Sequence, residues 1–211
     1  LCDKNDMVAR AYQGGVPMGS NFQVAVKNGQ SITPTFLVNA VKDPGTRRNP
    51  GTDLQRVQII KGWVDSDGET HEKVFDVAGD ANTDAGVDPS NCSTTGQGFA
   101  QLCAVWQDPE FNDSQNAFYY ARVLENPSCR WSTRQCQTAG VNPFAEDCKS
   151  QIEPANARAH ARGAQGPVYD KCCLAEADEP FYSPIIQERA WTSPIWLNAK
   201  AEGGNVIISE E

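Results

Sequence analysis

Short apolar runs rich in β-branched and aromatic residues recur along the chain and are separated by turn signals. They lie at residues 36–41, 57–64, 74–77, 118–124 and 190–196. Each run has the length and composition of a β-strand. Between the runs, prolines follow Asp or Asn, as at Asp43-Pro44 and Asn49-Pro50, which is the chemistry of turns. The pattern predicts a mainly β protein, an antiparallel β-sandwich with long loops and little helix.

The run over residues 57–64 alternates in part. Val57 and Ile59 share one face with Lys61 and Trp63, and the intervening residues share the other. Partial alternation of this kind is typical of a sheet that is packed on one side. The residues expected in the core of the sandwich are Phe36, Val38, Val57, Ile59, Phe75, Tyr120, Val123, Trp191 and Ile195.

A hairpin is expected where the polar string Asp65-Ser66-Asp67-Gly68-Glu69 separates two of these runs. Gly68 supplies the positive φ that an Asp-Gly turn needs. The same string resembles the opening of a calcium loop, but Val77 stands about where a later bidentate carboxylate is needed. We therefore favour a polar hairpin tip over a calcium site.

Two long segments lack periodic apolar positions. Residues 78–116 are expected to form a tied loop, and residues 125–180 are loop-rich with one good short helix at residues 155–162. Residues 114–124 fit a capped helix or a strand, and the Phe-Tyr-Tyr run favours the strand.

The chain has eight cysteines, and their spacing favours disulfides. They are Cys2, Cys92, Cys103, Cys129, Cys136, Cys148, Cys172 and Cys173. A zinc site would need paired C-x₂-C spacings or nearby histidines, and the sequence has neither. We expect Cys92 to bond Cys103, and the adjacent Cys172 and Cys173 to bond elsewhere in the chain. Disulfides place the protein in an oxidising compartment, secreted or periplasmic.

The net charge is −9, which argues against nucleic acid and anionic membranes as partners. No apolar stretch reaches the roughly 18 residues of a membrane-spanning helix.

The sequence shows no recognisable arrangement of catalytic residues. His71 and His160 are expected in solvated positions, and the carboxylates are scattered. The five tryptophans could line a sugar-binding face, although in strands they more often belong to a core. We therefore assign no catalytic, cofactor-binding or metal-binding residue in this chain.

Four strings resemble segments of one large bacterial family, the domain-of-unknown-function family 3604. They are Gly14–Gly19, Leu54–Val64, Phe118–Thr133 and Gln187–Trp196, and the resemblance covers most of residues 1–198. It implies a longer, exported protein whose upstream part resembles a metal-dependent hydrolase barrel of the polymerase-and-histidinol-phosphatase type. The histidine and carboxylate ligands of any divalent metal would lie in that barrel. This chain would be the C-terminal part, with residues 1–198 as a single β-sandwich-like domain and residues 199–211 as a tail.

The resemblance implies an accessory domain without its own catalytic residues, which packs against the barrel, shapes the rim of its active site or holds substrate. The partner would be the upstream part of the same polypeptide or a second chain. Strands at residues 36–41 and 57–60 carry no proline and little charge, so we expect that partner to donate a strand to an open sheet edge. Alternatively, the loop around Cys2 folds back and caps the edge itself. A stand-alone secreted module that binds carbohydrate or protein is the alternative, and a free-standing enzyme with chemistry on its long loops is a third possibility.

Overall fold

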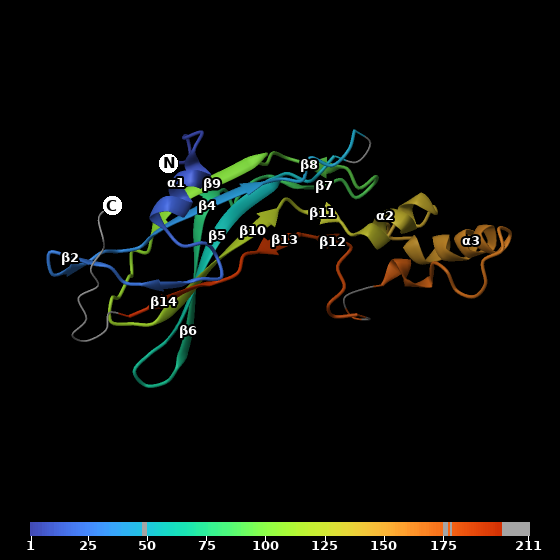
Figure 1. The fold of residues 1–211 in the computed structure, drawn as a ribbon. Coiled ribbons are helices and arrows are strands. Elements are labelled where there is room, and N and C mark those ends of the chain that lie inside the picture. Colours follow the sequence, from blue (N-terminus) through green and yellow to red (C-terminus); the bar gives the residue numbers. More distant parts are fainter. Residues whose placement is uncertain (48–49, 175–176, 178, 200–211) are drawn as a thin grey trace. The chain divides into compact units, whose positions relative to one another are not determined.

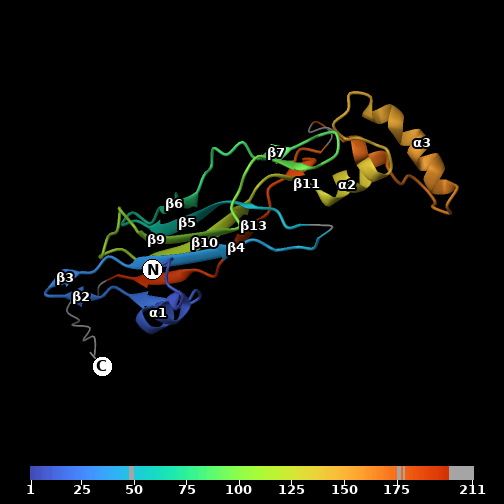
Figure 2. The same cartoon turned by 90° about the horizontal axis from the view of Figure 1, so that it is seen from above.

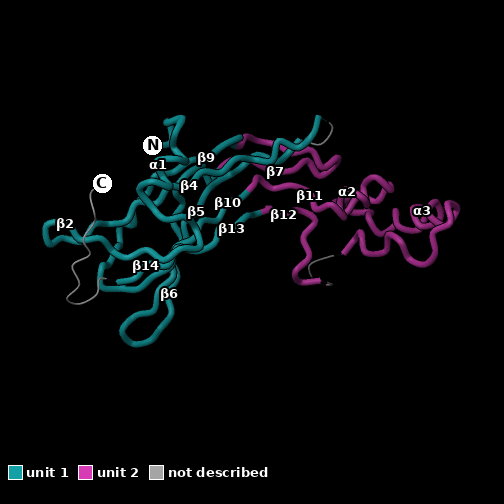
Figure 3. Tube along the Cα trace, in the orientation of Figure 1, with its two compact units in different colours: residues 1–82, 99–124, 189–211 teal, residues 83–98, 125–188 magenta. Residues whose placement is uncertain are grey.

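The computed structural model describes residues 1–47, 50–174, 177 and 179–199 (Figure 1). The expected tail, residues 199–211, therefore lies outside the described residues except for Ala199. The chain forms two compact units (Figure 3). The first unit contains residues 1–82, 99–124 and 189–211, and the second contains residues 83–98 and 125–188. The single domain expected over residues 1–198 stays a prediction.

The first unit is built mainly of strands. Its elements are α1 (Met7–Gly14), β1 (Asn21–Gln23), β2 (Val26–Lys27), β3 (Gln30–Ser31), β4 (Thr35–Val41), β5 (Leu54–Val64), β6 (Thr70–Gly79), β9 (Gln101–Gln107), β10 (Ala117–Glu125), β13 (Arg189–Trp191) and β14 (Ile195–Asn198). A six-stranded sheet has the order β1-β14-β10-β5-β6, and β13 also pairs with β10. β1 runs parallel to β14, whereas β10 is antiparallel to β13 and β14. β4 and β9 form a separate antiparallel ladder of seven residue pairs.

The mainly β class is confirmed, and the described residues form three α-helices and small, mixed sheets. The strands predicted at residues 36–41, 57–64, 74–77 and 118–124 are confirmed as β4, β5, β6 and β10. The expected strand at residues 190–196 is interrupted between β13 and β14, because Pro194 cannot donate to a ladder. The expected loop at residues 78–116 is wrong in part, because it contains β9.

The core of the first unit lies between the large sheet and the β4–β9 ladder. Its fully buried members are Val24, Ile59, Ala117, Tyr119 and Leu197. Two ring contacts join the layers: Phe36 to Tyr119 with centroids 4.6 Å apart, and Phe75 to Trp106 with centroids 4.9 Å apart. Along β9, residues that face this core alternate with more exposed ones, as expected for a strand with one buried face.

Burial corrects part of the predicted core. Val57 and Ile59 are fully buried, as expected, but Trp191 is exposed. The other predicted core residues are half-buried, and Tyr120 among them lies on the outer face of the sheet, so its assignment to the core is wrong. β5 was expected to pack on one side only, yet almost all of it is buried on both faces. The second face is covered because the Phe118 ring lies over Gly62, where an added Cβ would overlap the ring.

The second unit contains the helices that the sequence pattern largely missed. Its elements are β7 (Gly86–Val87), β8 (Thr94–Thr95), β11 (Ser128–Cys129), α2 (Trp131–Thr138), α3 (Cys148–His160), a 3-10 helix (Asp170–Cys173) and β12 (Ile185–Ile186). α2 and α3 lie side by side (Figures 1 and 2) around a small core that includes Val141 and Ala155. The predicted helix at residues 155–162 corresponds to the second half of α3, which begins seven residues earlier and includes Pro154.

All eight cysteines form disulfides, and each lies within one unit. The pairs are Cys2–Cys103, Cys92–Cys129, Cys136–Cys172 and Cys148–Cys173. The expected Cys92–Cys103 bond is wrong, because Cys103 belongs to β9 in the first unit and Cys92 to the second. As expected, Cys172 and Cys173 do not bond each other: Cys172 bonds Cys136 of α2, and Cys173 bonds Cys148 of α3.

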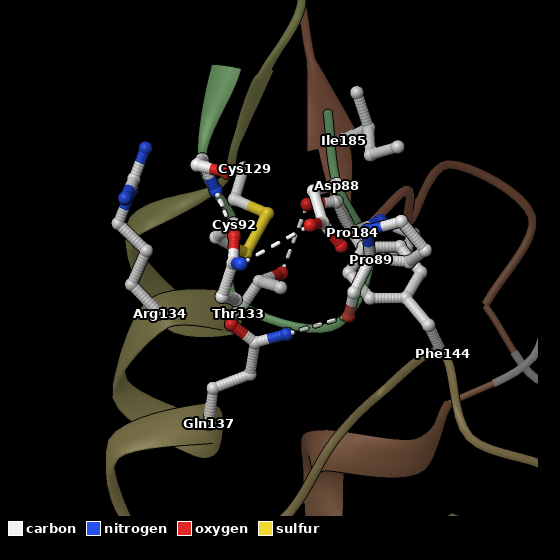
Figure 4. Close-up of a disulfide and its surroundings, with 12 residues drawn as sticks. Asp88, Pro89, Cys92, Cys129, Thr133, Arg134, Gln137, Phe144, Pro184 and Ile185 are labelled. Atoms are coloured by element: carbon white, nitrogen blue, oxygen red, sulfur yellow. Dashed lines mark hydrogen bonds between the residues drawn. A yellow bond between two sulfur atoms is a disulfide. The ribbon is translucent and has the colours of Figure 1, made fainter. Parts of the chain in front are cut away.

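Figure 4 shows how the Cys92–Cys129 bond is surrounded by hydrogen bonds within the second unit. From α2, the Gln137 amide donates to the Pro89 carbonyl at 2.9 Å. The Thr133 hydroxyl donates to the Pro184 carbonyl, also at 2.9 Å. These two bonds hold the segments around Pro89 and Pro184 against α2.

Candidate functional site

The outer face of the large sheet, opposite the core, carries a group of aromatic side chains. Phe118 and Tyr120 project from β10 with nearly parallel rings, 6.3 Å between centroids. Trp196 of β14 lies opposite Phe118 in the ladder, and their ring centroids are 5.4 Å apart. Trp191 and Trp196 are 58% and 48% exposed, respectively. We call Phe118, Tyr120, Trp191 and Trp196 the aromatic strip.

A shallow groove of about 520 Å³ follows the aromatic strip, and Thr192 and Pro194 complete its lining. We call it the aromatic groove. The segment between β13 and β14 is held in place by hydrogen bonds. Thr192 makes two with Ala121, donating its N–H and accepting at its hydroxyl, each at 3.0 Å. The Pro194 carbonyl accepts from the Gly19 N–H at 2.9 Å. The exposed indoles therefore stand on a fixed backbone.

The sequence prediction that the tryptophans belong to the core is wrong for three of them. Trp63 and Trp106 are half-buried against the core, but Trp131 on α2 and the two indoles of the aromatic strip are exposed. In an unbroken strand, residues 191 and 196 would point to opposite faces, because their separation is odd. The interruption at Pro194 brings both to one groove. This break is the signal in the sequence that could have identified the groove.

Polar side chains continue the same sheet face beside Tyr120. The Arg122 guanidinium donates through Nε to the Gln58 amide oxygen at 2.8 Å, and the Gln58 amide donates to Asp76 at 2.7 Å. Arg122 is directly opposite Trp191 in the β10–β13 ladder. Within the described part of the chain, the terminal guanidinium nitrogens of Arg122 and the hydroxyl of Tyr120 have no hydrogen-bond partner. These groups are available to a ligand.

A larger cleft of about 1200 Å³ lies where the β5–β6 hairpin meets the start of β10 and the end of β14. His71 stacks on Trp63 with a centroid distance of 5.2 Å, and its Nε2 lies 2.6 Å from an Asp65 carboxylate oxygen. The hydrogen bond with His71 and those from the Glu69 and Asp67 N–H groups hold the pKa of Asp65 below its usual range.

The polar hairpin tip expected at residues 65–69 is confirmed. β5 and β6 are antiparallel on either side of it, and Gly68 has φ +83°. The described residues contain no group of three or more metal-ligating side chains close enough to hold an ion, and the expected calcium-loop position Val77 lies within β6. His160 is exposed at the end of α3, where its ring bonds the Gly166 carbonyl.

A buried charged cluster lies on the core side of β5. The Lys61 ammonium is 2.6 Å from an Asp108 carboxylate oxygen and 2.8 Å from the Glu110 carbonyl. The Tyr119 hydroxyl donates to the same Asp108 oxygen at 2.7 Å. Burial opposes ionisation of Asp108, but the hydrogen bonds from Lys61, Tyr119 and the Glu110 N–H outweigh it and lower its pKa. Burial, together with Asp108, raises the pKa of Tyr119. Lys61, Asp108 and Tyr119 do not belong to the linings of the two clefts described above.

Several strands of the first unit end a sheet in the described part of the chain, and β4 is one of them. In the described part of the chain, β4 pairs with β9 alone. The Lys42 N–H donates to the Ala100 carbonyl just beyond the ladder, so by alternation the backbone groups of Leu37, Asn39 and Val41 point away from β9. β4 contains neither charge nor proline. The expected open strand at residues 57–60 is wrong, because β5 is a central strand.

Residues 1–161 match a family described as "Protein of unknown function (DUF3604)". Neither the curated proteins nor the solved structures include a match. The described residues include no helix long and apolar enough to cross a membrane. The four disulfides favour a compartment other than the cytoplasm.

Proposed function

Since the chain belongs to the family DUF3604, whose function is unknown, we propose that it is a non-catalytic accessory domain of an exported, metal-dependent hydrolase. The hydrolase barrel and its divalent metal would lie in the upstream part of the same polypeptide or in a second chain. The accessory domain would pack against the barrel, shape the rim of its active site or hold substrate. In this proposal the protein is secreted or periplasmic, in agreement with its four disulfides.

The observation that carries this proposal is the open edge of β4. A strand edge with unpaired N–H and C=O groups invites another strand, and natural proteins blunt such edges with charge, proline or a bulge. β4 has no charge and no proline over its seven residues. A strand of the hydrolase part would pair with Leu37, Asn39 and Val41 and extend the β4–β9 ladder. With that strand in place, the ladder and the large sheet would form the two layers of an antiparallel sandwich.

The test is the intact mass of the protein isolated from its natural source under non-denaturing conditions. A mass far above 23.0 kDa, or a second chain that stays bound, is the expected result. The isolated assembly should hydrolyse phosphate or ester substrates only when a divalent metal is present, whereas residues 1–211 alone should not. A native monomer of 23.0 kDa contradicts the proposal.

The aromatic groove favours one second candidate, a stand-alone secreted module that binds a carbohydrate or a protein. Its indoles are exposed on a fixed backbone, and polar groups continue the same face. This candidate predicts a monomer that binds its ligand in the absence of any other polypeptide.

A further inference from the structure

We propose that the aromatic groove binds a neutral oligosaccharide, whose sugar rings stack on Trp191 and Trp196 while its hydroxyls bond to Tyr120 and Arg122. The proposal rests on the substrate-holding part of the proposed function, but it does not need a hydrolase partner. It concerns the outer face of the large sheet, which is separate from the β4 edge.

The shape of the site suits a narrow ligand with apolar faces and polar rims. A sugar ring presents C–H groups on its faces and hydroxyls around its edge. The groove offers indole and phenyl faces, and an indole also carries an N–H that can bond at its edge. Its volume of about 520 Å³ lies in the range of small-ligand sites.

The groove is already ordered without a ligand. Thr192 fastens the β13–β14 connection to Ala121, and Phe118 rests on Gly62 of β5. Immobile aromatic rings lose little conformational entropy on binding, so stacking on them contributes more to affinity. A flexible loop would have to be ordered first.

Polar groups lie beside the rings and give the groove a hydrogen-bonding rim. Protein interfaces also favour Tyr, Trp and Arg, so the variants described below must separate a sugar from a polypeptide. Here Arg122 lies opposite Trp191, and it is followed across the sheet by Gln58 and Asp76. Arg122 retains guanidinium donors, and Tyr120 retains its hydroxyl, without partners among the described residues. Sugar hydroxyls both donate and accept, so one ligand satisfies both groups.

The charge of the whole protein disfavours a polyanionic ligand. Close to the groove, Asp76 accepts from Gln58 and is 3.3 Å from the Arg56 guanidinium, so its charge is already paired and Arg122 is left for the polar groups of a ligand. The protein as a whole carries a net charge of −9, which repels a polyanionic glycan.

The experiment measures binding of residues 1–211, produced in an oxidising host, to an array of neutral glycans, followed by titration of the best binder with tryptophan fluorescence. The variants are Trp191→Ala, Trp196→Ala and Arg122→Met, and Trp131→Ala is the matched control. Trp131 is 68% exposed but lies on α2, in the second unit. We expect each groove variant to lose about tenfold or more in affinity and the control to lose nothing.

No binding to any neutral glycan overturns the proposal, as does binding that the two indole variants leave unchanged. If those variants instead abolish self-association or the capture of a second polypeptide, the groove is a protein interface and the proposal is wrong. Failure of the hydrolase proposal would appear as a native monomer of 23.0 kDa, a result that leaves sugar binding on the array untouched.

Discussion

At the scale of single residues, the clearest dependence is that of the core on the Lys61–Asp108 pair. Their side chains are 4% and 0% exposed, and the Tyr119 hydroxyl and the Glu110 N–H complete the bonds to the carboxylate. Removing one charge of a buried pair leaves the other without compensation. The stabilising contribution therefore belongs to the complete network rather than to the ion pair alone.

The substitution Asp108→Asn tests this dependence. Because it leaves the Lys61 ammonium buried beside a neutral amide, we expect the free energy of unfolding to fall by about 3–5 kcal/mol. Urea unfolding followed by tryptophan fluorescence measures it. Lys73→Met is the control, since the Lys73–Glu110 pair is exposed and its loss should cost no more than about 1 kcal/mol. Equal losses in the two variants would contradict the role assigned to the buried pair.

The loss of stability in acid should depend on the same carboxylate, that of Asp108. The pKa of Asp108 is lower in the folded protein than in the unfolded chain, so its contribution is complete above the unfolded value of about 4. The contribution is lost as the pH falls from there through the lowered folded pKa. We expect the stability of the natural sequence to drop across this window and that of Asp108→Asn to drop less. Unfolding curves between neutral and strongly acidic pH give the two slopes, and identical slopes would refute the prediction.

Gly62 controls the floor of the aromatic groove. An added methyl group would overlap the Phe118 ring, which would then have to move off β5. We expect Gly62→Ala to destabilise the protein by about 1–3 kcal/mol and to change the fluorescence of the neighbouring Trp196. Gly14→Ala is the matched control: no atom lies within 4 Å of the added Cβ, and alanine favours the α1 helix. A neutral Gly62→Ala would mean that the ring is free to move.

At the scale of elements, α2 depends on cross-links. Its sequence has no apolar stripe, and its buried members are only Thr133 and Cys136. Replacing Cys136 and Cys172 by alanine opens a crosslink across 36 residues, which should cost about 4 kcal/mol. Amide exchange should then be faster in α2 and in the 3-10 helix at residues 170–173. Exchange in β5 provides the internal reference, and an unchanged α2 would contradict this account.

The sequence predicts the elements that have strong local patterns and misses those that depend on distant contacts. β5 and β10 were predictable, because their apolar runs are long and β-branched or aromatic. β9 alternates Leu102, Ala104 and Trp106 inward, but turn-forming residues around it conceal the pattern. α2 has no intrinsic signal, since a disulfide and tertiary hydrogen bonds order it.

The candidate site was harder to predict than the fold. The tryptophans are visible in the sequence, but their exposure follows from the interruption at Pro194. Cysteine pairing could not be derived either, because it depends on which segments enter each unit. The short sequence separation favoured a bond between Cys92 and Cys103. In the fold, Cys103 bonds Cys2, which lies near the start of the chain.

At the scale of the whole molecule, the open edge of β4 determines how the chain behaves without a partner. Its outward backbone groups at Leu37, Asn39 and Val41 can pair with the same strand of a second copy, and no charge opposes that contact. We therefore expect residues 1–211 alone to self-associate as concentration rises. Val41→Lys, at a position that is 66% exposed, should shift the chain towards monomer.

Light scattering coupled to size-exclusion chromatography measures this equilibrium over a range of concentrations. Val8→Lys is the matched control, because it adds the same charge to an exposed position of α1, outside the strands. A charge on β4 interferes with strand pairing directly, whereas the control changes only the net charge. Suppression by Val41→Lys alone therefore assigns self-association to the edge. A monomer at every concentration, with all strands protected from amide exchange, would show that β4 needs no partner and would remove the main support for the accessory-domain proposal.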